Sequence, residues 1–116
     1  MAVNSRPQPI KKSSDFSRIN LKGKRIKLCP WLTLLVHQSE DDKSYFGLTV
    51  SRKIGKAVTR NKLKRWVRNC VLKESWPSQF KGKQVVFLFR AQSDDFFKKL
   101  EFKEFKRIYF EKILSE

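Results

Sequence analysis

The sequence predicts an α+β fold, a small two-layer sandwich in which helices cover one mixed sheet. Two stretches, residues 28–36 and 84–90, are almost continuously apolar, which is typical of buried strands. Two others, residues 56–75 and 94–114, carry apolar residues at helical spacing. With one more helix near the start, the expected order is α-β-β-(β)-α-β-α. At this length we expect a single domain over residues 10–116.

The N-terminal part is predicted to be an arm followed by a helix. Residues 1–9 contain two prolines and no hydrophobic periodicity, which indicates a flexible basic arm. The helix should be capped by Ser13 or Ser14 and should end near Gly23. Burial preference by itself favours a core position over a ligand-binding one for Phe16 on this helix.

The segment after this helix, residues 24–36, is predicted to contain at least one strand. Residues 24–27 are basic and form either a short strand or a turn. If residues 28–36 are one strand, then Trp31, Thr33 and Leu35 lie on the same side of it.

A second strand is expected after a polar connection. Residues 38–43 are polar and acidic, which predicts an exposed hairpin loop. Residues 44–51 are rich in β-branched and aromatic residues, as a returning strand would be. Gly47 within it predicts a bulge or a close approach of another segment. Over residues 45–90 a strand, a helix and a strand follow one another, so two strands can be parallel with a basic helix as the crossover.

Residues 52–68 are the most informative stretch, because eight of the seventeen are Lys or Arg and none is acidic. They predict a loop and then a helix that begins near Ala57 and ends before Pro77. At 100° per residue this helix has one cationic face with a single amide and one apolar face. The predicted nucleic-acid-binding residues are Arg52, Lys53, Lys56, Arg60, Asn61, Lys64, Arg65 and Arg68.

The C-terminal part predicts one strand and one helix. Residues 84–90 form the strand, and Ser93 or Asp94 would cap a helix that runs to about Leu114. The apolar stripe of this helix consists of Phe102, Phe105, Ile108, Tyr109 and Ile113.

The charge of the chain indicates a polyanionic partner. There are 27 Lys and Arg against 11 Asp and Glu, a net charge of +16. A solvated surface without a partner is disfavoured, because the basic helix lacks acidic residues for i,i+4 pairs. An anionic membrane is disfavoured as well, because the apolar face of the helix must cover the sheet. RNA is favoured over DNA, since no second helix follows at the distance of a helix-turn-helix.

The side chains predict no catalytic residue and no metal ligand in the polypeptide. Cys29 and Cys70 are far apart and are expected to be reduced, and His37 has no partner residues for catalysis. The glycines are isolated, so no phosphate-binding loop is expected. The chain contains no apolar run long enough to span a bilayer and no signal peptide, which predicts a cytoplasmic protein without membrane contact.

The basic helix carries a motif of the form R-N-x-x-K-R, present here as RNKLKR at residues 60–65. Through it the chain resembles the protein component of bacterial ribonuclease P. The similarity includes the strand and loop FGLTVSRKIGKAV at residues 46–58 and the early segment IKKSSDF at residues 10–16. It spans residues 10–114.

The resemblance implies a ribonucleoprotein that removes the 5′ leader from precursor tRNA by endonucleolytic hydrolysis in the bacterial cytoplasm. The catalyst would be the RNA subunit with Mg²⁺, while the protein alone binds no cofactor. The partners would be the catalytic RNA and the 5′ leader of precursor tRNA. The resemblance also implies a left-handed crossover around the basic helix.

The family places the leader in a cleft between the first helix and the sheet, which moves Phe16 from core residue towards cleft lining. The residues that the resemblance implies for this leader cleft are Lys12, Phe16, Trp31 and Arg90. One departure is Asn20, which stands where relatives often have an aromatic residue.

Three functions remain open on the sequence. The first is the ribonucleoprotein enzyme subunit. The second is a structural RNA-binding protein of the ribosomal kind, which the charge and the aromatic residues would suit equally. An autonomous nuclease is disfavoured, because paired carboxylates and a histidine base are missing.

Overall fold

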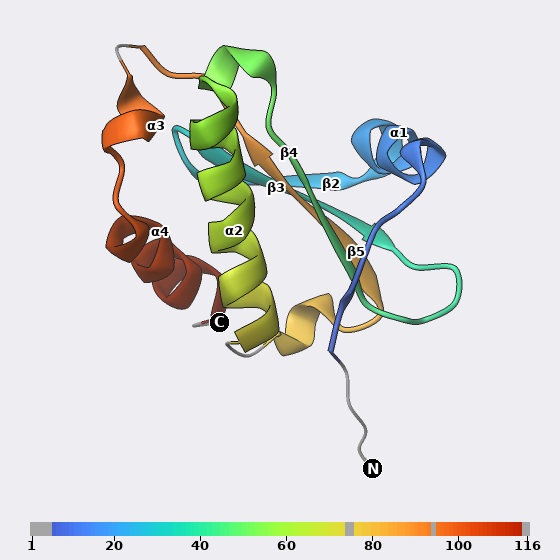
Figure 1. The fold of residues 1–116 in the computed structure, drawn as a ribbon. Helices are drawn as coiled ribbons and strands as arrows, with labels where there is room; N and C mark the ends of the chain where they lie inside the picture. Colours follow the sequence, from blue (N-terminus) through green and yellow to red (C-terminus); the bar gives the residue numbers. More distant parts are fainter. Residues whose placement is uncertain (1–5, 74–75, 94, 115–116) are drawn as a thin grey trace.

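A five-stranded mixed sheet forms the centre of the computed structural model, which describes residues 6–73, 76–93 and 95–114 (Figure 1). The strands are β1 (Gln8–Pro9), β2 (Lys24–Cys29), β3 (Leu32–Gln38), β4 (Tyr45–Thr49) and β5 (Lys83–Phe89). Their order in the sheet is β1-β4-β5-β3-β2. β4 pairs in parallel with β1 and β5, whereas β3 is antiparallel to β5 and β2.

Helices lie on both faces of the sheet. They are α1 (Ser13–Lys22), α2 (Ala57–Lys73), α3 (Phe96–Lys99) and α4 (Phe102–Ile108), with the short 3₁₀ helices η1 (Arg52–Ile54) and η2 (Ser78–Phe80) and a π-helical end, η3 (Tyr109–Leu114). In Figure 1, α2 crosses one face with α3 and α4 beside it, and α1 lies apart from them at the other end of the sheet.

The apolar residues of the strands divide between two hydrophobic clusters. In β5, Val85 and Phe87 belong to the large cluster with α2 and α4, while Val86 belongs to a small cluster with Ile19 of α1. Successive side chains of a strand point to opposite faces, so α1 covers the face opposite α2. β5 reads as a continuous apolar run because both of its faces are covered.

The predicted α+β fold is confirmed, and so is the parallel pairing of β4 with β5 around α2. α2 begins at Ala57 as predicted. Gly47 keeps its register opposite Val86 without a bulge, and the segment that approaches it closely is the side chain of Phe16. α1 adds a partial third layer to the expected two.

Three strand predictions are wrong. Residues 8 and 9, assigned to the arm, form β1 and hydrogen-bond to β4. The apolar stretch 28–36 is not one strand, because Pro30 and Trp31 form the turn between β2 and β3. Residues 38–43 do not close a hairpin, because β5 lies between β3 and β4.

The C-terminal helix and the first cap also differ from the prediction. The backbone is extended at Leu100 (ψ 138°), which separates α3 from α4. Ser93 does not begin the helix, and Asp94 lies outside the described residues. At α1 the residue before the helix is Lys12, which makes no capping hydrogen bond with its side chain.

Candidate nucleic-acid interface

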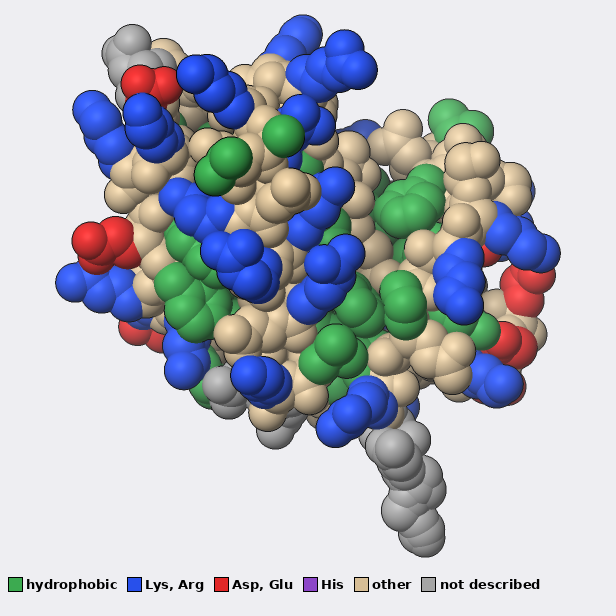
Figure 2. Space-filling view, viewed as in Figure 1, with side chains coloured by type: hydrophobic (Ala, Val, Ile, Leu, Met, Phe, Trp, Pro, Cys, Tyr) green, Lys and Arg blue, Asp and Glu red, His purple; other side chains and the backbone are tan. Residues whose placement is uncertain are grey.

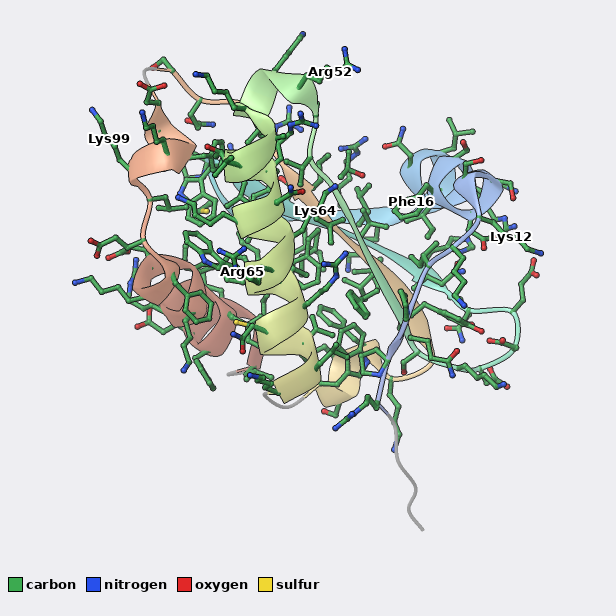
Figure 3. All side chains as sticks on the ribbon, in the orientation of Figure 1. Lys12, Phe16, Arg52, Lys64, Arg65 and Lys99 are labelled. Carbon is green, nitrogen blue, oxygen red and sulfur yellow. The ribbon has the colours of Figure 1, made fainter. Side chains whose placement is uncertain are left out.

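The face of α2 that points away from the sheet carries the predicted cationic residues. Asn61, Arg65 and Arg68 are exposed, and Arg60 and Lys64 are half-buried. The opposite face is buried in the main core through Leu63, Trp66, Val67, Cys70 and Val71. The division of the helix into two faces is therefore confirmed. Figure 3 shows Lys64 and Arg65 along the outer side of α2.

The loop before α2 is shaped by Gly55 and held by Arg60. Gly55 has a φ of 154°, a backbone conformation that side chains with a Cβ rarely adopt. The Nε of Arg60 donates a hydrogen bond to the carbonyl oxygen of Gly55 at 3.1 Å. The predicted residues Arg52, Lys53 and Lys56 are all exposed in this loop. The cationic face of α2 therefore extends into the loop that precedes the helix.

These cations have no acidic neighbours in the sequence. The sequence contains no Asp or Glu between residues 43 and 73. Among the residues that the structure describes, no salt bridge involves a cation of η1 or α2. Figure 2 shows Lys and Arg spread across the front of the molecule, with acidic side chains towards its left and right margins. The mutual repulsion of these cations is relieved by a polyanion.

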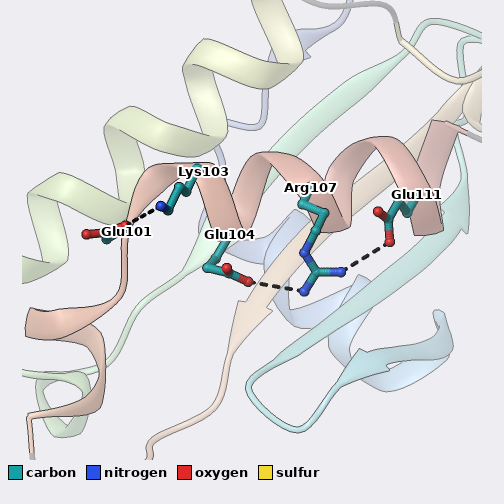
Figure 4. Close-up of polar contacts among 5 residues, drawn as sticks. All are labelled: Glu101, Lys103, Glu104, Arg107 and Glu111. Carbon is teal, nitrogen blue, oxygen red and sulfur yellow. Dashed lines mark hydrogen bonds and ion pairs between the residues drawn. The ribbon is translucent and has the colours of Figure 1, made fainter.

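Two cations of α4, Lys103 and Arg107, differ from those of α2, because carboxylates pair with them (Figure 4). Arg107 bridges Glu104 and Glu111, with both N–O distances at 3.1 Å. Lys103 lies 3.4 Å from Glu101. The charges of Lys103 and Arg107 are therefore locally neutralised.

Lys62 lies within the basic motif but does not belong to its exposed face. Its ammonium group donates hydrogen bonds to the carbonyl oxygens of Phe97, Lys98 and Leu100 at 2.8, 3.2 and 3.3 Å. It also lies 5.0 Å from the ring centroid of Trp66. Burial lowers the pKa of Lys62, and the charge of Arg65 acts in the same direction.

A second surface feature is the groove between α1 and the sheet. Its lining residues are Phe16, Ser17, Asn20, Leu35, Thr49, Val86 and Leu88. Phe16 is half-buried, and its ring lies over Gly47, where an added Cβ would come within 2.7 Å of the ring. Phe16 therefore both packs on the sheet and lines the groove (Figure 3).

Four groove residues were not predicted, namely Ser17, Thr49, Val86 and Leu88. Thr49 and Leu88 are partners in the register of β4 and β5. Side-chain alternation in β5 could have found two of them, since Val86 and Leu88 face away from the core positions Val85 and Phe87. The resemblance placed the first helix against the sheet, but nothing in the sequence showed which face of the sheet it covers.

The other predicted cleft residues lie in different places. Lys12 is exposed directly before α1 and lines a neighbouring hollow with Pro9 and Asp15. Arg90 is exposed just after β5, two residues beyond Leu88, and does not itself line the groove.

The prediction for Trp31 is wrong. Its side chain is only 7% exposed, and it packs against Phe89, Phe96 and Phe97 in the main core. The groove lies on the opposite face of the sheet. The expected alternation with Leu35 fails because Trp31 belongs to the turn that precedes β3.

The described residues contain neither a candidate metal site nor a helix that could span a membrane. No group of three His, Cys, Asp or Glu side chains lies close enough together to hold a metal ion. None of the described helices has both the length and the apolar character needed to cross a membrane.

Comparison with known proteins gives consistent matches. The family model described as ribonuclease P matches residues 5–113. The ribonuclease P protein component of Clostridioides difficile is 31% identical over 91 residues, which are 78% of this chain and 79% of that protein. The component of Staphylococcus aureus is 41% identical over 86 residues, 74% of this chain and 73% of that protein. The solved structure of the RNase P protein from Thermotoga maritima superposes with a TM-score of 0.71 at 30% identity, covering 89% of this chain and 92% of that one.

Proposed function

The chain belongs to the ribonuclease P protein family, and on this premise we propose which of its surfaces meets which RNA. The protein is the RNA-binding subunit of a ribonucleoprotein endoribonuclease that matures the 5′ end of tRNA. Membership of this family does not favour the alternative function, a structural RNA-binding protein of the ribosomal kind.

The cationic face of α2 and its preceding loop binds the catalytic RNA subunit. The observation that carries this proposal is the exposed row of cations without acidic partners among the described residues. Such a row releases counterions from the RNA phosphates that it neutralises, which supplies affinity and makes it depend on salt. Asn61 adds an exposed amide that can hydrogen-bond a sugar, a base edge or a phosphate.

The groove between α1 and the sheet holds the 5′ leader of precursor tRNA. The half-exposed ring of Phe16 offers a stacking surface for an unpaired base, and Leu88 extends the apolar floor. Lys12 and Arg90 lie exposed just outside the groove, where they can meet phosphates of the leader. Trp31 has no part in this site, because it is buried on the other face.

The chemistry belongs to the RNA subunit and the Mg²⁺ that it binds. Mg²⁺ prefers oxygen ligands, and the face proposed to meet the catalytic RNA carries no carboxylate. The contribution of this chain is to neutralise phosphates and to hold the leader in place. We further propose that it does so in the bacterial cytoplasm, where precursor tRNA is made.

A cleavage assay tests this proposal. Precursor tRNA is incubated at low Mg²⁺ with a bacterial catalytic RNA, with and without the protein. We expect the protein to stimulate cleavage and Lys64→Ala to reduce the stimulation. No stimulation by the wild-type protein would contradict the role as a subunit, and cleavage by the protein alone would contradict the assignment of the chemistry to RNA.

A further inference from the structure

α3 places two exposed lysines beside the proposed RNA-binding surface. Lys98 and Lys99 occupy the last two positions of this short helix, and both are exposed. Lys98 lines a groove together with Lys56 of the loop and Thr59 of α2. In Figure 3, α3 lies beside the first half of α2, and Lys99 projects from α3 into solvent on the side away from α2. The cationic surface of α2 therefore continues across this groove onto α3.

The position of α3 is set by α2 itself. A helix of four residues does not persist by its own hydrogen bonds. Phe97 anchors it in the main core at 1% exposure, and Lys62 supplies three hydrogen bonds to carbonyl oxygens at its end. Lys62 thus uses its charge to bind α3, while its neighbours in the basic motif remain exposed.

The lysines of α3 resemble the cations of α2 in having no salt bridge among the described residues, and in this they differ from Lys103 and Arg107 of α4. No salt bridge to Lys98 or Lys99 occurs among the described residues, whereas Lys103 and Arg107 of α4 are paired with carboxylates (Figure 4). One acidic residue, Asp95, lines the groove, against three lysines. The groove is therefore cationic on balance and open to an anion.

We propose that α3 is a second contact element for the catalytic RNA, in which Lys98 and Lys99 meet phosphates and Lys62 is the positioning residue that holds them there. The inference rests on the proposed function, because its ligand is the RNA that binds α2. The backbone of that RNA passes over the groove between Lys56 and Lys98, so phosphates on both sides of it are neutralised.

The experiment measures the affinity of the protein for the catalytic RNA at several salt concentrations. For Lys98→Ala/Lys99→Ala we expect a slope of log affinity against log salt that is smaller by roughly two, one for each lost phosphate contact. The matched control is Lys43→Ala/Lys83→Ala, which removes the same charge from an exposed lysine just before β4 and a partly exposed one at the start of β5, the opposite end of that strand from α3. It should leave the slope nearly unchanged.

The outcomes separate this inference from the proposed function. If Lys64→Ala lowers the slope and the α3 double variant does not, then α2 binds RNA and the inference about α3 is wrong. If neither variant changes the slope, the proposed function itself fails. Equal effects of the α3 variant and the control would mean that net charge, and not contact, is responsible, which also overturns the inference.

Lys62→Met tests the positioning role. The substitution keeps the length of the side chain but removes the hydrogen bonds to α3, and circular dichroism and thermal unfolding verify that the domain stays folded. We expect the salt slope to fall, and adding Lys98→Ala/Lys99→Ala to change it little further, because the lysines are already displaced. Fully additive effects of the three substitutions would show that Lys62 does not position α3.

Discussion

The ring of Phe16 lies directly over the backbone of Gly47, so that a Cβ added at Gly47 would be 2.7 Å from Cζ of the ring. This contact fastens α1 to β4 within the groove proposed for the leader. Only glycine leaves room for the ring, which explains a glycine in the middle of a paired strand. Phe16 therefore contributes to the stability of the domain and to the shape of its groove.

Gly47→Ala should displace Phe16 and loosen α1. We expect the free energy of unfolding to fall by about 1–3 kcal/mol, as for other overpacked sites. Urea unfolding measures it. In a Phe16→Ala background the same substitution should cost much less, because the clash with the ring is gone. An equal cost in both backgrounds would show that the contact with Phe16 is not the cause.

Phe16→Ala should weaken binding of precursor tRNA more than binding of mature tRNA. Loss of one stacked base is worth about 1–3 kcal/mol, and mature tRNA lacks the leader that would stack. Binding of both RNAs to the holoenzyme gives the comparison. Because the ring is half-buried, unfolding is measured in parallel, with Phe16→Leu as the variant that keeps most of the packing. A loss of equal size for both RNAs would favour a purely structural role.

Lys64→Ala should lower the salt slope of catalytic-RNA binding by about one, as expected for one lost phosphate contact. The ammonium group of Lys64 makes no salt bridge among the described residues, so the substitution removes little besides the charge. An unchanged slope in the titration would speak against the cationic face as the RNA-binding surface.

Arg60→Ala should weaken catalytic-RNA binding more than Lys64→Ala does. It removes a charge and also the hydrogen bond to the carbonyl oxygen of Gly55, which holds the loop of residues 52–56. The salt slope should therefore fall by more than about one, since Arg52, Lys53 and Lys56 lose their fixed positions. Arg60→Lys keeps the charge and separates the two effects: it should retain part of the affinity. Identical losses for Arg60→Ala and Lys64→Ala would contradict the role in the loop.

The carboxyl group of Asp41 should titrate far below its ordinary range. Hydrogen bonds from the hydroxyl of Ser39, the hydroxyl of Tyr45 and the amide of Lys43 lower its pKa from 3.8 to about 2. Because the folded pKa is the lower one, its stabilising contribution is complete above pH 3.8 and is lost as the pH falls through about 2.

An NMR titration of the Asp41 side chain checks this value, and unfolding at several acidic pH values checks the linkage. Asp41→Asn should remove this part of the pH dependence and leave the rest. The same carboxylate raises the pKa of Tyr45, so the tyrosine should titrate later in the wild type than in the variant. A midpoint for Asp41 near 3.8 would contradict the prediction.

The features that sequence reasoning predicted correctly depend on local periodicity. The two faces of α2 follow from the 3.6-residue repeat, so Leu63 and Arg65 could be assigned to opposite sides without knowledge of the fold. The motif and the surrounding segments identified the family. The continuous apolar run in β5 likewise predicted a strand with two covered faces.

Several of the errors concern contacts between residues distant in the chain, and others concern breaks and turns that no periodicity marks. The polar segment after β3 looked like a hairpin loop, yet the partner of β3 is β5, some fifty residues further on. Trp31 looked like a cleft residue, because the turn at Pro30 reverses the chain before the alternation of β3 begins. The C-terminal helix looked continuous, and nothing local showed that Lys62 would bind its interrupted end.

The sequence by itself determined the cationic face of α2 and the kind of partner it suits, because charge and helical period are properties of a single segment. Only the tertiary structure decided that Phe16 packs on Gly47, and that Lys62 donates hydrogen bonds to α3 instead of lying on the cationic face. The reason is physical: the two lysines Lys62 and Lys64 are alike in sequence, and which carbonyl groups need a donor is known only once the chain has packed.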